Sequence, residues 1–365
     1  MFRESFQHSS ILEKEFSTNS RITALWAFSE AALGGILHAL RIPFTGLLIG
    51  GSAVIFLTLI AYSAERKSTL LKATFIVILI KAMVSPHTPL NAYIAVFLQG
   101  LFAYVIFSSV SNKKFAALLL GFVALTYSAF QRVFVLTILF GNTLWESIDA
   151  FGIYLMNEFL SNDTGNSALQ LSYILIGAYG FVHISGGIFF GIVAGNIHKW
   201  IINNSGKVKE FNESIIQKDE SILLQKDKTK KKRKWWSKKS NIAVASFAIF
   251  MMVISYTNPE LDDNLFYNII FMLIRSILIM YVWFVLLSPV IIRWVKKYLL
   301  KKQSDYSKEI ESIIALFPYF KGIINYSWEQ TKGLKNYKRI IPFLKNSFIL
   351  LLMADIESYE KSNII

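Results

Sequence analysis

The chain has 365 residues, of which 54% are hydrophobic and 17% are charged, and its mean hydropathy is +0.45. One soluble core does not bury that much apolar surface, so the composition excludes an ordinary soluble protein and predicts a membrane protein with several spans. The apolar residues form blocks of roughly 17 to 28 residues, which predicts membrane-crossing helices and argues against a barrel. Because the chain has no cysteine, disulfides, thiolate metal sites and cysteine nucleophiles are excluded.

Eight transmembrane helices are predicted, after a polar start at residues 1–21 that lacks the basic and apolar regions of a cleaved secretory signal. The sequence therefore predicts an all-α, polytopic membrane protein. The predicted spans are 22–40, 43–63, 69–84, 91–110, 114–140, 168–197, 241–257 and 266–293.

The formal charge of +14 is distributed unevenly between the predicted loops. If the N-terminus is inside, the cytoplasmic loops 64–72 and 111–114, the stretch after His198 and the stretch after Arg293 are all basic. The predicted outer segments, taken together, are acidic, and the acids lie in 141–167 and 257–264. This distribution agrees with the positive-inside rule, so both termini are predicted to be cytoplasmic.

A polar linker divides the chain. Residues 205–240 hold twelve Lys or Arg against five Asp or Glu, and Trp235 and Trp236 precede the next span. We interpret this stretch as a solvated cytoplasmic linker whose basic end anchors that span at the lipid headgroups, in preference to a nucleic-acid-binding segment. The predicted domains are 1–203, with six spans, the linker 204–240, and 241–365, with two spans and a cytoplasmic tail.

Small residues recur at every fourth position in two of the spans, and such stripes allow another helix to approach closely. For the sixth span, internal packing is the favoured interpretation. For the first span, internal packing and docking of another transmembrane module both remain open. The stripes are Ala27, Ala31, Gly35 and Ala39 in the first span, and Gly187, Gly191 and Gly195 in the sixth.

No P-loop, HExxH or GxSxG motif occurs, and the five histidines are scattered. We therefore expect no enzyme activity, no bound metal and no cofactor.

Polar side chains inside predicted spans are more informative, because an intramembrane charge is expensive and usually faces a partner or a cavity. Glu30 and Arg132 either form a structural ion pair or face a ligand. His183 is interpreted as the donor or acceptor of an interhelical hydrogen bond. The full set is Glu30, Lys81, Gln99, Gln131, Arg132 and His183.

The outer segments differ in length. Prolines restrict the short loops 41–46 and 85–91. The longer segment 141–167 is amphipathic, and either caps a cavity or rests on the membrane surface. Its apolar face carries Trp145, Ile148, Gly152, Leu155 and Phe159.

The stretches "ALGGILHALRIPFTGLLIGG" and "KAMVSPHTPLNAYIAVFLQG" occur in a six-span unit with a small-residue stripe on its first span. Over roughly residues 20–200 the chain resembles the substrate-binding S component of energy-coupling factor (ECF) transporters. The tail is similar to the coupling helices of the ECF T component, whose Ala-x-Arg-x-Gly-type motifs dock on ATPases. Here "EQTKG" (Glu329–Gly333) and "ADIESY" (Ala354–Tyr359) occupy those places.

Both motifs depart from the family pattern. Lys332 replaces an arginine, and the second motif has no basic residue, so the ionic contact with an ATPase is in question. Only two spans precede the tail, fewer than in a full T component. The second half therefore resembles a shortened T-like module fused to an S-like one.

The resemblance implies a membrane subunit of an ECF-type ABC uptake transporter in a bacterial plasma membrane. It would bind a vitamin or related micronutrient at its outer side, among membrane lipids, and couple to separate ABC ATPase subunits. Tyr93 and Trp145 would stack on a planar ring, and Arg132 would pair with an anion. The implied ligand-binding residues are Arg41, His87, Thr88, Asn91, Gln99, Arg132, Trp145 and His183, and the implied partner-docking residues are Ala27, Ala31, Gly35, Ala39, Glu329, Lys332, Gly333, Ala354 and Glu357.

Two other functions remain open. One is a membrane scaffold or assembly factor that does not transport and that recruits a cytoplasmic partner through its basic linker and tail. The other, which the scattered polar residues favour least, is a membrane enzyme acting on lipids.

Overall fold

The computed structural model describes residues 18–39, 44–85, 88, 90–160, 170–204, 265–301, 310–311, 313–314, 316–334 and 337–353. The regular structure in these ranges is helical throughout. A first helix over residues 18–28 continues through a π-helical turn, η1, into α2. The elements are η1 (Ser29–Leu33), α2 (Gly34–Ala39), α3 (Thr45–Ser63), α4 (Ser68–Val84), α5 (Leu90–Ser109), α6 (Lys113–Phe140), α7 (Thr143–Leu160), α8 (Leu171–Asn203), α11 (Leu265–Tyr281), η2 (Val282–Leu287), α12 (Ser288–Lys301), α14 (Phe317–Gln330) and α15 (Tyr337–Met353).

The prediction of an all-helical fold is confirmed in the described part of the chain, and its long apolar helices are compatible with a multi-pass membrane protein. Seven of the predicted spans coincide with helices to within a few residues at most ends, whereas span 241–257 lies outside the described residues. Five described helices are long and apolar enough to cross a membrane, judged by length and composition. They are Thr45–Ser63, Asn91–Ser109, Lys113–Phe140, Leu171–Asn203 and Tyr267–Ile291.

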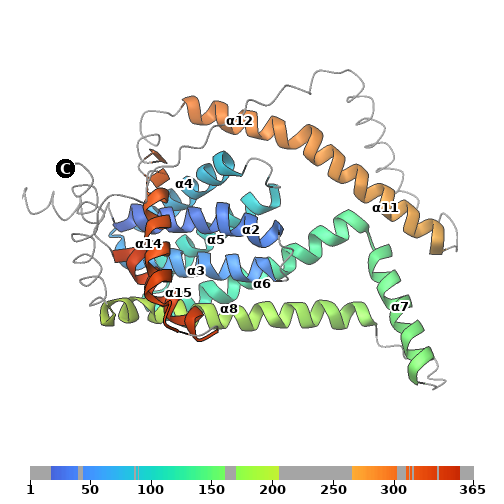
Figure 1. The fold of residues 1–365 in the computed structure, drawn as a ribbon. Helices are drawn as coiled ribbons and strands as arrows, with labels where there is room; N and C mark the ends of the chain where they lie inside the picture. The colour runs from blue at the N-terminus through green and yellow to red at the C-terminus, as the bar shows by residue number, and fades with distance from the viewer. Residues whose placement is uncertain are drawn as a thin grey trace, which may run out of the picture.

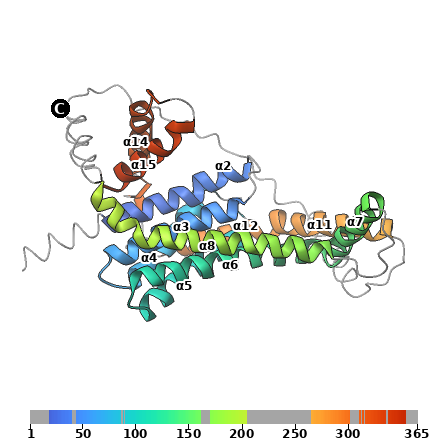
Figure 2. The same ribbon diagram turned by 90° about the horizontal axis from the view of Figure 1, so that it is seen from below.

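The first helix, α3, α4, α5, α6 and α8 form a bundle (Figures 1 and 2). One end carries the basic residues Arg66, Lys67, Lys113 and Lys114, and we call it the basic end. Tyr62 shows that α3, α6 and α8 meet there, because Lys113 lies 5.1 Å from its ring centroid and the ring of His198 stacks on it at 5.2 Å. The opposite end, where α3 begins at Thr45, is called the pocket end.

Glycines bring α6 and α8 into backbone contact. A Cβ added at Gly121 would clash with the carbonyl oxygen of Gly187 and lie 2.9 Å from the Cα of Gly191. A Cβ at Gly191 would lie 2.7 Å from the Cα of Leu118. The interpretation of the sixth-span stripe as internal packing is therefore confirmed, since these backbones meet only where side chains are missing.

The stripe on the first helix is divided between two environments. Ala27 and Ala31 are buried in the bundle, so this part of the stripe serves internal packing. Gly35 is exposed, and a Cβ added there would meet no atom within 4 Å. The side chain of Ala39 lies outside the described residues. Among the stripe residues whose burial the structure describes, Gly35 is the one that remains accessible to another module.

Helix α7 turns away from the bundle at the pocket end (Figures 1 and 2). The turn begins at Gly141, whose φ of +69° favours glycine. Asp149 then accepts hydrogen bonds from the backbone N–H of Ser172 at 2.7 Å and from its hydroxyl at 2.9 Å. The carboxylate of Asp149, which α7 holds against the first turn of α8, complements the partial positive charge of that helix end, so the direction of α7 is set electrostatically as well as by packing.

The C-terminal hairpin formed by α14 and α15 packs on the flank of the bundle near its basic end (Figure 1). Phe28 of the first helix meets Phe317 and Phe320 with ring centroids 5.7 and 6.5 Å apart. Phe28 lies about 10 Å along the helix from Arg21, whose guanidinium donates to the carbonyl oxygen of Leu352 at 3.2 Å. The hairpin therefore contacts the apolar part of the first helix as well as its charged end.

Replacing Phe348 with alanine is expected to loosen the hairpin. Its ring lies 6.2 Å from Phe56 on α3 and 6.3 Å from Trp200 on α8. Losing a half-buried aromatic ring with two aromatic partners costs roughly 2 kcal/mol. Limited trypsin digestion should then cleave at Lys338 and Lys345 faster than in the native protein.

The matched control is Phe130→Ala, because Phe130 is 66% exposed on α6. Its digestion pattern should match the native one. Equal cleavage of Phe348→Ala and native protein would show that these aromatic contacts do not hold the hairpin.

Candidate ligand pocket

A cavity of about 510 Å³ opens among the helices at the pocket end. The elements η1, α3, α4, α5, α6 and α8 all contribute to its wall, so its shape depends on most of the bundle. A volume of this size suits a small molecule. The polar residues of the lining are Glu30, Thr45, Lys81, Asn91, Gln99, Ser128, Gln131, Arg132 and Tyr179.

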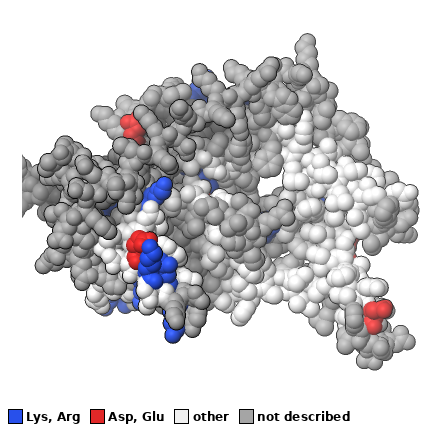
Figure 3. Space-filling model, viewed as in Figure 1, with Lys and Arg blue, Asp and Glu red and all other residues white. Residues whose placement is uncertain are grey.

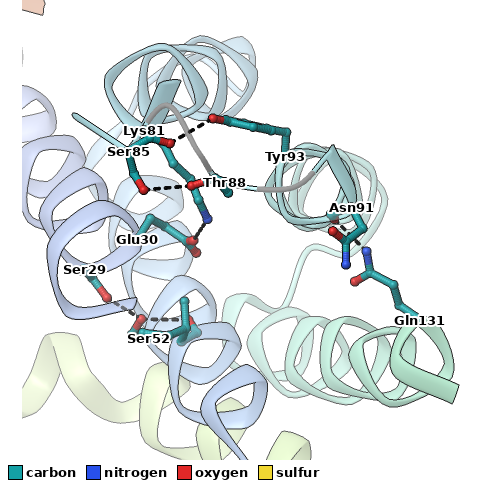
Figure 4. A network of polar contacts seen from close by, with 10 residues as sticks. Ser29, Glu30, Ser52, Lys81, Ser85, Thr88, Asn91, Tyr93 and Gln131 are labelled. Atoms are coloured by element: carbon teal, nitrogen blue, oxygen red, sulfur yellow. Dashed lines mark hydrogen bonds and ion pairs between the residues drawn. The ribbon is translucent and has the colours of Figure 1, made fainter. Parts of the chain in front are cut away.

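Glu30 and Lys81 form a buried ion pair on one wall of the cavity. Lys81 Nζ lies 2.7 Å from a carboxylate oxygen of Glu30, and the two side chains are 9% and 3% exposed (Figure 4). Glu30 lies in the π-helical turn, which is anchored by a 2.8 Å hydrogen bond between the hydroxyls of Ser29 and Ser52. Of the two alternatives for Glu30 and Arg132, the ion pair between them is therefore wrong, because α4 and not α6 brings the nearest cation to η1.

Gln99 lies at the deep end of the cavity, between α3 and α6. The residue is 6% exposed, and its Oε1 has no hydrogen-bond partner in the part of the chain that the structure describes. A Cβ added at Gly50 would lie 3.5 Å from Gln99 Nε2 and 2.6 Å from a methyl group of Leu125, so these three residues meet at one level. Because Oε1 is enclosed by the protein, Nε2 is the amide atom that a ligand in the cavity would meet.

Asn91, Gln131 and Arg132 form the outer rim. Gln131 Nε2 donates to the backbone oxygen of Asn91 at 2.6 Å and joins α6 to α5 (Figure 4). Arg132 is exposed toward the cavity and forms no salt bridge within the described ranges. The lining thus holds one carboxylate and two cations, and its net charge is +1.

An aromatic wall completes the site. Phe44, which precedes α3, has a φ of +60°, a conformation that bulky side chains rarely adopt. Its ring stacks on Tyr179 of α8, with centroids 6.1 Å apart. The sequence reasoning missed both residues. The signal available for Tyr179 was its position one helical turn before His183.

His183 is fully buried behind this wall and does not line the cavity. Its Nδ1 lies 3.0 Å from the carbonyl oxygen of Tyr179, within the same helix, and its ring lies 4.2 Å from that of Tyr179. The predicted interhelical hydrogen bond is therefore wrong, because Nε2 of His183 is buried without a partner among the described residues and the ring packs against Tyr179.

Two other predicted ligand residues lie elsewhere. Trp145 donates from Nε1 to the hydroxyl of Thr137 at 3.0 Å, and α7 contributes no residue to the lining, so of the two alternatives for segment 141–167 its described part does not cap the cavity. Thr88 donates to the hydroxyl of Ser85 at 2.9 Å within the turn before α5 and does not line the cavity. Tyr93 likewise donates to the backbone of that turn, so it is not a stacking platform.

Of the eight predicted ligand residues, the structure places Asn91, Gln99 and Arg132 in the lining. Arg41 and His87 lie outside the described residues. Across the described ranges, no group of three or more His, Cys, Asp or Glu side chains could hold a metal ion.

The predicted partner-docking residues of the tail are only partly described. Lys332 Nζ lies 2.7 Å from a carboxylate oxygen of Glu329, and both side chains are largely exposed. Gly333 is open to its surroundings, whereas Ala354 and Glu357 lie outside the described residues. On the face shown in Figure 3, basic side chains gather where α14 and α15 lie.

Comparison with protein-family models, curated proteins and solved structures finds no match to this chain.

Proposed function

We propose that this chain is a multi-pass membrane protein that binds a small molecule in the cavity at the pocket end. The observation that carries the proposal is the polar lining of a 510 Å³ cavity within a bundle of apolar helices. Polar side chains facing a cavity inside a membrane protein are expensive to keep, and they usually mark a ligand or ion pathway.

The resemblance of the sequence supports a more specific proposal, in which the chain is the membrane subunit of an ECF-type uptake transporter in a bacterial plasma membrane. In this proposal residues 1–203 are a six-helix S-like unit that captures a vitamin or related compound from outside. Residues 204–240 are a cytoplasmic linker, and residues 241–365 are a two-span T-like unit whose tail couples to separate ABC ATPases. Both termini would be cytoplasmic, as the positive-inside rule requires.

The contact between the hairpin and the bundle supports this arrangement. Ile313 and Phe320 of the tail belong to the same buried cluster as Trp26 of the first helix. A force that moves the hairpin would therefore act on the helix that carries Glu30 to the cavity. Coupling between sites needs such a contiguous packed connection, or an equivalent element with two states.

Ligand capture is tested with the full chain in lipid nanodiscs, mixed with a bacterial metabolite extract, washed and examined by native mass spectrometry. The native protein should retain a small molecule. Ala95→Phe, which fills the cavity from α5, should lose at least about tenfold in affinity, equivalent to ~1.4 kcal/mol.

Val105→Phe is the matched control, because Val105 is 51% exposed on the same helix and away from the lining. It should bind as the native protein does. If the folded native protein retains no small molecule, or if Ala95→Phe retains it unchanged, the proposed function is wrong.

The tail favours the scaffold alternative. Within the diverged motif Lys332 is already paired with Glu329, so its charge is less available for an ionic contact with an ATPase. Affinity purification of the full chain from its own cells distinguishes the two functions. Recovery of an ABC ATPase favours transport, and recovery of another stable partner without any ATPase favours a scaffold.

A further inference from the structure

We propose that the ligand of this cavity is an elongated anion that carries a carboxylate or phosphate at one end and a hydroxyl or carbonyl oxygen at the other, on the order of 10 Å apart. This inference rests on the proposed function, because it names the chemical class that the same cavity takes. It assigns the anion to Arg132 at the rim and the accepting oxygen to Gln99 Nε2 at the deep end.

The charge of the lining selects an anion. Glu30 and Lys81 neutralise each other at 2.7 Å, so the pair leaves no net charge to be matched. Arg132 is the remaining cation of the lining, and it faces the cavity without a carboxylate in the described part of the chain. A guanidinium binds a carboxylate or phosphate through two parallel hydrogen bonds, which a neutral group cannot match.

The deep end selects a hydrogen-bond acceptor. Gln99 lines the cavity, and its Oε1 is enclosed by the protein, so Nε2 is the amide atom that a ligand would meet. Nε2 points toward Gly50, which also lines the cavity. A ligand hydroxyl or carbonyl oxygen would accept from Nε2, whereas an apolar end would leave Nε2 without a partner among the described residues.

Helix geometry sets the distance between the two groups. Gln99 lies at the level of Leu125, because both approach Gly50. Arg132 follows Leu125 by about two turns of α6, which corresponds to roughly 10 Å along the helix. Between the two levels Phe44 and Tyr179 present ring surfaces, so a planar or apolar middle is expected.

A set of four probes separates these requirements. The full probe is 4′-hydroxybiphenyl-4-carboxylate, which has the anion, the hydroxyl oxygen and the length. The corresponding carboxamide has a neutral group in place of the anion, biphenyl-4-carboxylate lacks the hydroxyl, and 4-hydroxybenzoate is too short. Binding is measured by saturation-transfer NMR and calorimetry on the full chain in nanodiscs, with native protein, Arg132→Gln, Gln99→Leu and the exposed control Arg66→Gln.

The full probe should bind native protein and Arg66→Gln at least tenfold more tightly than any other probe. Arg132→Gln should abolish the preference for carboxylate over carboxamide while keeping the preference for the hydroxyl. Gln99→Leu should do the reverse. Because each variant removes one preference and keeps the other, misfolding cannot imitate the result.

Three results would overturn the inference. In the first, the carboxamide binds native protein as tightly as the acid. In the second, each variant keeps both preferences. In the third, no probe binds. If the protein still retains a neutral metabolite from the extract in that case, the proposed function stands and this inference alone fails. Nanodiscs with and without phosphatidylglycerol identify the source of the anion, since loss of probe binding in the anionic lipid would assign Arg132 to a lipid headgroup and overturn the soluble ligand.

Discussion

Replacing Lys81 with methionine is expected to destabilise the protein by roughly 3 to 5 kcal/mol, because it leaves the carboxylate of Glu30 buried without its partner. The two side chains are 9% and 3% exposed and joined at 2.7 Å, so little water reaches the carboxylate once the ammonium group is lost. Thermal unfolding in detergent, followed by circular dichroism, measures the loss.

The double variant Glu30→Gln with Lys81→Met should recover much of this stability, since removing both charges removes the cost of burying one alone. The control Lys114→Met removes an exposed ammonium at the basic end and should change stability by no more than about 0.5 kcal/mol. If Lys81→Met unfolds at the native temperature, the pair does not contribute to stability as its geometry indicates.

Valine at Gly121 should cost about 3 kcal/mol or more, because the added side chain meets backbone on the neighbouring helix. The obstructing atoms are the carbonyl oxygen of Gly187 and the backbone of Gly191, and neither moves unless α8 moves as a whole. Since α6 and α8 form the most extensive helix contact in the bundle, thermal unfolding should shift strongly.

Gly177→Ala on α8 is the matched control. A Cβ there meets no atom within 4 Å, so the change should be neutral or stabilise the helix by up to ~1 kcal/mol. Similar unfolding temperatures for the variants at 121 and 177 would show that α6 and α8 do not touch as described.

Hydropathy located the helices well, because a segment in lipid has few ways to satisfy its backbone hydrogen bonds. Each apolar block long enough to span the hydrocarbon must satisfy its backbone internally and so forms a helix. The ends of α3, α5 and α6 lie within two residues of their predicted positions. The first helix was predicted as a regular span, but a π-helical turn at Ser29–Leu33 interrupts it. The composition of the segment does not predict that turn.

The candidate site was predicted in part. Gln99 and Arg132 were recognised because polar groups inside spans are expensive, whichever helices surround them. Trp145 was assigned to the same site from its position in an outer segment. It lies elsewhere because α7 turns away from the bundle after Gly141 and is held by Asp149 on the start of α8.

The apolar, multi-helix character of the chain and the few costly polar groups inside its helices can be read from the amino-acid order, since these properties depend on each segment's own composition. The pairing of Glu30 with Lys81 and not with Arg132, and the position of Arg132 at a cavity, become visible when the helices are packed together. Pairing depends on which helices are neighbours and how each is rotated. Those are set by backbone contacts such as Gly121 against Gly187, which hydropathy does not encode.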